Sequence, residues 1–276
     1  MSLAVFYLRI FDVGYTTILT IFSSLLGRGR FAICYRSERL DIRENMDAKL
    51  KPISDVFNEI HEKFGGNLSL GEPFLELAES HECRARIIRH AGQLLGVMAS
   101  DEHQKLISTY FDEIFGDMVC SLYFFFTGLD IPGRMMLRRS LELSLVGISY
   151  WDDPASFWAW NSKNRDVSFS ELEEYLLSQG YARYLEVVGC LDVSIMQASV
   201  KELRKIFGIL SNVVHPKPYN FETVSASRFV FSENDLKVSL DLLEAIQISL
   251  LKIMACRFSV IQPALVSSFP NLEKLI

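Results

Sequence analysis

The chain lacks the short motifs that identify the common enzyme classes. It contains no glycine-rich phosphate loop, no HExxH and no GxSxG, which removes the usual signatures of P-loop enzymes, zinc proteases and serine hydrolases. Its five cysteines are scattered and form neither a CxxC pair nor a Cys/His cluster with metal spacing. They predict free thiols in a reducing compartment, which favours a cytoplasmic location, and the sequence predicts no metal or cofactor.

An excess of positive charge is also missing. The 276 residues carry 28 Lys and Arg against 34 Asp and Glu, a formal net charge of −6. This balance argues against a nucleic-acid binder that works through a broad basic surface, although it leaves room for a local basic pocket. Hydrophobic residues make up 49% of the chain and charged residues 22%, so a sizeable core can form.

Strand signals are absent as well, because no segment shows sustained alternation, a βαβ rhythm or a repeat period. Apolar residues instead recur at helical spacing. The pattern predicts helices over residues 50–64, 72–98, 103–126, 134–150, 154–160, 168–177, 181–190, 199–214 and 236–261. Residues 219–232 are predicted to be a loop, with or without a short strand. The predicted fold is an all-α multi-helix bundle whose core holds an antiparallel helical hairpin, residues 103–126 with 134–150.

Residues 1–45 differ from the helical bundle domain predicted over residues 46–276. Residues 3–26 are almost all apolar, but Arg9 and Asp12 leave an uninterrupted run that is too short for a confident membrane span. The basic start and the cleavage site of a signal peptide are both lacking. Three interpretations stay open: a buried N-terminal helix or hairpin, a membrane-associating segment, and a non-native extension from a misassigned start, since a clean amphipathic pattern opens at Met46.

Two polar islands interrupt the apolar helices, and the first is on residues 134–150. Arg138 and Glu142 lie four residues apart and therefore share a helix face. One interpretation is a solvated ion pair, worth about 0.3–0.5 kcal/mol. The other is a buried charge pair, which needs further hydrogen bonds around it. The apolar neighbours of the pair leave both open.

The second island ends the predicted helix 199–214, where His215 is followed at once by Pro216. The histidine is either a cap or a packed core residue, or else a general base or phosphate contact, since imidazole titrates near neutrality. Ser211 lies one turn earlier and shares its face. Arg204 lies about 16 Å away along the helix and is not expected to join the site.

The remaining histidines show no mutual metal spacing. We predict that they are surface or interface residues: His61, His81, His90 and His103.

The two islands together resemble one branch of the HEPN-like helical proteins, over residues 115–251. The resemblance is carried by Arg-x-x-x-Glu in Arg138–Glu142 and by Leu-Ser-x-x-Val-His-Pro in Leu210–Pro216. It implies a compact helical bundle of the kind common in prokaryotic defence and toxin–antitoxin loci. It also implies metal-independent RNA cleavage at a dimer interface, in which His activates the 2′-hydroxyl and Arg holds the phosphate.

The chain departs from the usual HEPN motif, which is Arg, four to six residues, then His. The positions that should offer Arg are Gly208, Ile209 and Leu210. His215 therefore lacks its family partner unless Arg138 supplies the guanidinium from the facing helix.

Two functional hypotheses follow. The first is a HEPN-like effector that cleaves RNA or binds nucleotides, with Arg138, Glu142, Ser211 and His215 as its site residues. The second is a non-enzymatic interaction or regulatory protein in which the same residues form a buried structural network. The candidate partners are RNA or a nucleotide, another protein, and a second copy of the chain, while membrane association through residues 1–45 stays open.

The N-terminal boundary makes the first testable prediction. A chain beginning at Met46 is expected to stay soluble and helical by circular dichroism, because the amphipathic pattern restarts there. The full chain measured in the same buffer is the control. Aggregation or loss of the helical signal would mean that residues 1–45 belong to the core, against both the extension and the membrane interpretations.

Overall fold

The computed structural model describes residues 53–163, 166–190, 192–214 and 231–270. All of them lie in the second of two compact units, Lys51–Ile276. The predicted N-terminal segment, residues 1–45, lies outside the described residues, as do His215 and most of the predicted loop 219–232. Within the described part of the chain, no helix is both long enough and apolar enough to cross a membrane.

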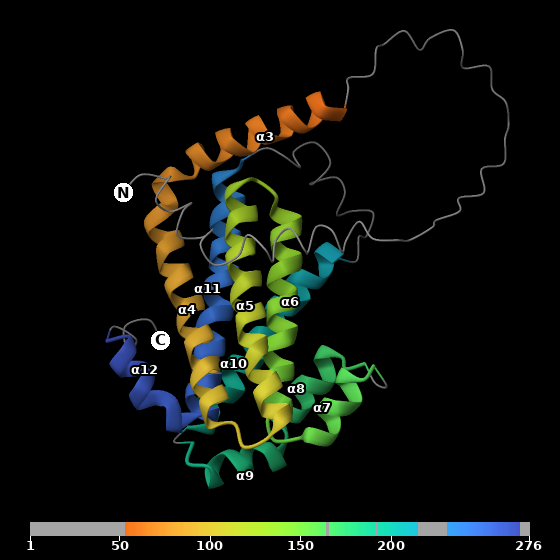
Figure 1. Cartoon of the computed structure of the whole chain (residues 1–276), viewed down its shortest axis with the longest axis vertical. Helices are drawn as coiled ribbons and strands as arrows, with labels where there is room; N and C mark the ends of the chain where they lie inside the picture. The colour runs from red at the N-terminus through yellow and green to blue at the C-terminus, as the bar shows by residue number, and fades with distance from the viewer. Residues whose placement is uncertain (1–52, 164–165, 191, 215–230, 271–276) are drawn as a thin grey trace, which may run out of the picture. The chain divides into compact units, whose positions relative to one another are not determined.

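The described residues form helices and no strands, which confirms the predicted all-α bundle (Figure 1). The α-helices are α3 (Ile53–Leu70), α4 (Leu75–Met98), α5 (Glu102–Phe126), α6 (Asp130–Tyr150), α7 (Pro154–Asn161), α8 (Phe169–Leu177), α9 (Gln179–Val187), α10 (Val193–Val214), α11 (Glu233–Arg257) and α12 (Gln262–Ser268), and short 3-10 turns occupy η1 (Glu72–Phe74) and η3 (Ser259–Ile261).

Four long helices surround the core: α4, α5, α6 and α11 run side by side (Figure 1). The α5–α6 pair forms the antiparallel hairpin predicted from the sequence, closed by a tight turn at residues 127–129. Helix α10 packs against α6 and α11, and α8 packs against both α6 and α10. Fully buried apolar side chains fill the space between these helices, among them Ile88, Ile107, Phe111, Leu141, Leu203 and Leu250.

Small residues let the central helices approach closely. A Cβ atom at Gly92 of α4 would lie 2.2 Å from Cβ of Phe111 on α5. At the other end of the hairpin, a Cβ atom at Gly133 of α6 would lie 2.4 Å from the Phe125 ring. Each phenylalanine thus packs directly on the backbone of a neighbouring helix. Any side chain in place of the glycine would force the two helices apart.

Two of the long helices begin at a residue whose side chain caps the first turn. Asp101 accepts a hydrogen bond from the backbone N–H of Gln104 at the start of α5. Helix α11 is capped in the same way by Ser232, which accepts from the backbone N–H of Asp235. Asp130 is the first residue of α6 and not its cap, and its carboxylate binds Arg134 instead.

The predicted end of the first helix at residue 64 is wrong, because α3 continues through Gly65 and Gly66 to Leu70. A Cβ atom added at either glycine would have no neighbour within 4 Å, so no packing contact requires glycine at these positions. Both glycines are tolerated inside an exposed helix. Asn67 does not end the helix either, since its side chain donates a hydrogen bond of 2.8 Å to the carbonyl of Thr127. The chain turns at Gly71, where a Cβ would lie 2.6 Å from the Phe126 ring.

Two other predicted bounds also differ. Helix α10 begins at Val193, six residues before the predicted start at Ser199. The predicted final helix breaks after Arg257, where Phe258 leaves helical geometry at φ −119° and ψ 48°. Pro263, near the start of α12, has no N–H to donate to the preceding turn and so favours a break on its N-terminal side.

The contact between Gly92 and Phe111 makes a stability prediction. Gly92→Ala is expected to lower the free energy of unfolding by about 1–3 kcal/mol, because the added methyl overlaps a buried ring. Gly116→Ala on α5 is the matched control. No atom lies within 4 Å of its built Cβ, so the better helix propensity of Ala should leave stability unchanged or raise it by up to about 1 kcal/mol. Chemical denaturation of both variants measures the difference, and equal effects would contradict the close approach.

Candidate functional site

The predicted site residues come from two adjacent helices. Arg138 and Glu142 lie on α6 and Ser211 lies on α10, and these helices pack against each other. His215 follows the last residue of α10 and lies outside the described residues, so its contacts are not part of the geometry below.

Arg138 and Glu142 form the ion pair that their spacing predicts. Nε of Arg138 donates to Oε1 of Glu142 over 3.0 Å. The side chain of Arg138 is 19% exposed and that of Glu142 is 43% exposed. The pair is therefore neither the fully solvated nor the fully buried one considered from the sequence. Its arginine is largely covered and its carboxylate reaches solvent.

The guanidinium of Arg138 is covered by an aromatic ring of α10. Its Cζ lies 4.8 Å from the centre of the Phe207 ring. Nη1 of Arg138 is buried and makes no hydrogen bond to the described residues. The stacking fixes the plane of the guanidinium and removes water from one of its faces, which strengthens its interaction with any anion that reaches its edge.

Phe207 belongs to a stack that sequence reasoning missed. Its ring stacks on the Phe169 ring with centroids 4.2 Å apart and an interplanar angle of 18°. Beyond Phe169 lies Arg204, whose Cζ is 5.7 Å from that ring and which pairs with Glu173 over 3.4 Å. Two arginines, each with its own glutamate, thus bracket two aromatic rings. We call these four stacked residues, Arg138, Phe207, Phe169 and Arg204, the arginine–phenylalanine stack.

Ser211 is one turn beyond Phe207 on α10. Its hydroxyl donates a 2.7 Å hydrogen bond to the carbonyl of Phe207. Because the hydroxyl proton of Ser211 is used in this bond to its own helix, the side chain can only accept a further hydrogen bond through its oxygen. Phe207 thus contacts Ser211 through its backbone carbonyl and Arg138 through its ring.

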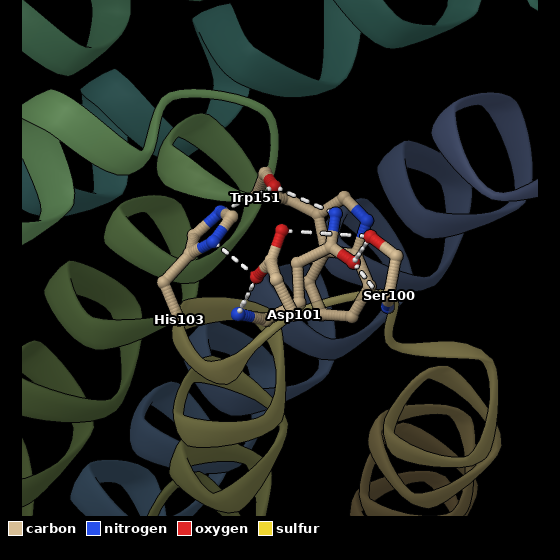
Figure 2. A network of polar contacts seen from close by, with 5 residues as sticks. Ser100, Asp101, His103 and Trp151 are labelled. Carbon is tan, nitrogen blue, oxygen red and sulfur yellow. Dashed lines mark hydrogen bonds and ion pairs between the residues drawn. The ribbon is translucent and has the colours of Figure 1, made fainter.

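A second polar cluster lies at the start of α5 (Figure 2). The two ring nitrogens of His103 face two acceptors, a carboxylate oxygen of Asp101 and the carbonyl of Trp151, the latter at 3.0 Å. Gln104 donates to the same Trp151 carbonyl over 3.1 Å. The hydrogen bond from the Gln104 backbone N–H, with help from His103, holds the pKa of Asp101 below its ordinary value. This cluster joins the first turn of α5 to the end of α6.

Two histidines that we predicted at the surface are buried. His103 is 4% exposed and His81 is 1% exposed. His81 pairs through Nδ1 with Oε1 of Gln247 at 3.2 Å, and Nε2 of Gln247 donates to the His81 backbone carbonyl. Burial lowers the pKa of His81. The prediction was wrong because the burial of both rings depends on segments distant in sequence, Gln247 for His81 and the Trp151 carbonyl for His103, which spacing alone does not reveal.

A third cluster lies between α5 and α6. Asp117 is nearly buried and accepts a 2.6 Å hydrogen bond from Arg139, which also reaches Glu113. Burial outweighs the nearby guanidinium and raises the pKa of Asp117 from 3.8 to about 6. Perturbed carboxyls of this kind occur at active sites and also in packed interfaces. Here the carboxyl sits between two packed helices, which favours the structural interpretation.

The structure offers little to hold a metal. Among the described residues, no group of three or more His, Cys, Asp or Glu side chains is placed to bind one. The four described cysteines, Cys83, Cys120, Cys190 and Cys256, are free thiols.

Comparison of the chain with protein-family models, with curated proteins and with solved structures finds no match. The resemblance to HEPN-like proteins therefore rests on the two sequence motifs alone.

The raised pKa of Asp117 makes a prediction for pH dependence. Its folded pKa of about 6 exceeds its ordinary 3.8, so the folded protein binds this proton more tightly than the unfolded chain does. The contribution of Asp117 to stability is consequently present below about pH 4 and is lost as the pH rises through about 6.

Asp117→Asn removes this titration. Relative to wild type, the variant is expected to gain about 1–3 kcal/mol of stability between about pH 4 and pH 7. Urea denaturation at several pH values measures that difference. Glu113→Gln is the control, because Glu113 also pairs with Arg139 but is half exposed. A constant difference between Asp117→Asn and wild type would contradict the raised pKa.

Proposed function

We propose that this chain is an RNA- or nucleotide-directed effector of the HEPN-like type, in which Arg138 holds a phosphate. One observation carries the proposal: the guanidinium of Arg138, which pairs with Glu142, lies against the Phe207 ring of α10, and α10 also carries Ser211. Three of the four residues selected from sequence thus come from two helices that pack together, although these residues lie about seventy positions apart in the chain.

The chemistry of Arg138 suits this role. A guanidinium binds phosphate oxygens through its Nη edge, and stacking on an aromatic ring fixes the direction of that edge before any ligand arrives. Phe207 provides the ring, and Glu142 occupies Nε alone. Neither Nη atom of Arg138 makes a hydrogen bond to a described residue. The donors of this edge are thus not used by the described part of the bundle.

His215 is assigned the role that the resemblance implies. It would take the proton of the RNA 2′-hydroxyl as that oxygen attacks the adjacent phosphorus. The bond from phosphorus to the 5′-oxygen of the next nucleotide breaks, and that oxygen takes up a proton, which gives a 2′,3′-cyclic phosphate and a 5′-hydroxyl without a metal. Ser211 lies four residues earlier in the sequence, and its oxygen can accept a hydrogen bond.

Cleavage of single-stranded RNA in EDTA tests the proposal. His215→Ala is expected to lower the rate by about 10²–10⁴-fold, the usual contribution of a general base, while leaving the melting temperature nearly unchanged. His61→Ala, at an exposed position on α3, is the matched histidine control and should cleave like wild type.

The stack supplies a second pair of variants. Arg138→Gln should abolish cleavage and weaken RNA binding, whereas Arg204→Gln should leave both intact. Both arginines lie against a phenylalanine ring and pair with a glutamate, but only Arg138 is among the residues proposed for the site. Wild-type protein that neither cleaves nor binds RNA or nucleotides, with EDTA or with added divalent metal, would contradict the proposal. Equal effects of the two variants would also contradict it.

A second candidate is a non-enzymatic interaction or regulatory protein, and the stack itself favours it. Both arginines are already paired with carboxylates and covered by rings, as in a network that fixes the register of α6, α8 and α10. If this candidate holds, Arg138→Gln and Glu142→Ala each cost about 1–3 kcal/mol of stability, and RNA turnover is absent from wild type and variants alike.

A further inference from the structure

A pocket of about 330 Å³ lies away from the arginine–phenylalanine stack, where the ends of several helices meet. It is bounded by the last turn of α4, the first turn of α5, the residues that follow α6 and α9, and the η3 turn after α11. Six of the residues that line it are apolar: Leu95, Met98, Trp151, Val188, Phe258 and Val260. Small-molecule sites combine apolar lining residues with a few polar groups that orient the ligand.

We propose that this pocket binds a small amphiphilic monocarboxylate, with its apolar tail against these apolar residues and its carboxylate at the polar side of the pocket. The polar side consists of Ser100, Gln104, Arg257 and Ser259. We infer a carboxylate because the polar groups that the described residues leave without a partner on this side of the pocket are N–H donors.

Gln104 is fixed in one orientation. Its Oε1 accepts hydrogen bonds from the backbone N–H and the hydroxyl of Ser100, at 2.9 and 3.0 Å. Its Nε2 donates one hydrogen to Trp151 (Figure 2). The acceptor end of the amide is thus saturated, while one N–H of Nε2 is left over. The part that Gln104 can offer to a ligand is a donor.

Arg257 adds further donors. Its Nη2 binds the carboxylate of Asp152 and the Tyr184 hydroxyl, the latter at 2.8 Å. Its guanidinium lies 4.7 Å from the Phe258 ring centre and 5.0 Å from that of Tyr184, which holds it in place. Nη1 makes no hydrogen bond to the described residues. A fixed guanidinium with an unused edge is suited to an oxygen anion.

The nearby acids do not compete for these donors. No Asp or Glu is among the described residues that line the pocket. Asp152 is bound by Arg257, and Asp101 is occupied by Gln104 N–H and by His103. Unused donors therefore predominate at the polar side, and the ligand that complements them presents acceptor oxygens at one end.

The volume limits the size of the ligand. At about 30 Å³ for each water-sized group, 330 Å³ holds on the order of ten non-hydrogen atoms. A medium-chain acid such as octanoate fits this limit. A ligand of that size with few polar contacts is expected to bind with a Kd between roughly 10 μM and 1 mM.

Titration calorimetry of the full chain with octanoate tests the proposal, with octan-1-ol and octanamide as matched ligands that lack the charge. We expect one octanoate per chain and at least tenfold weaker binding of the other two ligands. Val260→Trp places a large ring at the exposed rim of the pocket and should weaken octanoate binding at least tenfold.

Val238→Trp is the control for Val260→Trp. Position 238 is also an exposed valine, but it lies about 28 Å from Arg257 along α11, so octanoate should bind this variant as it binds wild type. No heat of binding with octanoate up to about 10 mM would overturn the proposal. Equal affinity for octan-1-ol or octanamide, or equal effects of the two tryptophans, would overturn it as well. The assay involves neither RNA nor His215, so its outcome is independent of the proposed effector function.

Discussion

The packing of Phe111 on the bare backbone at Gly92 sets the spacing of α4 and α5, and the arrangement of the other helices follows from it. Because α5 lies close to α4, α6 can return along α5 and present small residues, Ser140, Ser144 and Gly147, to the core. The polar groups brought inside are satisfied locally, as when Ser144 donates to the carbonyl of Ser140. At the outer face of this close-packed centre, the longer side chain of Arg138 on α6 meets Phe207 of α10.

Arginine that contacts both a ring and a carboxylate recurs at that outer face and at the ends of the bundle. Arg138, Arg204 and Arg257 each combine one carboxylate with at least one aromatic ring. The ring covers the guanidinium and the carboxylate binds one of its N–H groups, so Arg138 and Arg257 are held with few water contacts, whereas the side chain of Arg204 stays 44% exposed. An arrangement of this kind holds several helices in register. It also leaves individual N–H groups directed at whatever occupies the adjoining surface.

Apolar periodicity predicted the helices and the hairpin well, because each long helix has its own apolar residues at helical spacing. The periodicity failed where the end of a helix depends on a distant segment. Helix α3 continues through Gly65 and Gly66 and ends before Gly71, where the chain packs against the Phe126 ring. The ion pair of Arg138 and Glu142 is local and was predictable. The stack was not, because Phe169 on α8 and Phe207 on α10 meet only through the fold.

The pairing of His81 with Gln247 has a consequence for how the folded state can be observed. The side-chain amide of Gln247 hydrogen-bonds both to the ring and to the backbone carbonyl of His81. Because Oε1 of Gln247 can only accept a hydrogen bond, the pairing requires a proton on Nδ1 of His81. The imidazole is thereby locked in the less common neutral tautomer, with that proton shielded from solvent exchange. Since α4 and α11 must both be seated for this to occur, the ring is an intrinsic probe of whether the first and last long helices of the bundle have joined.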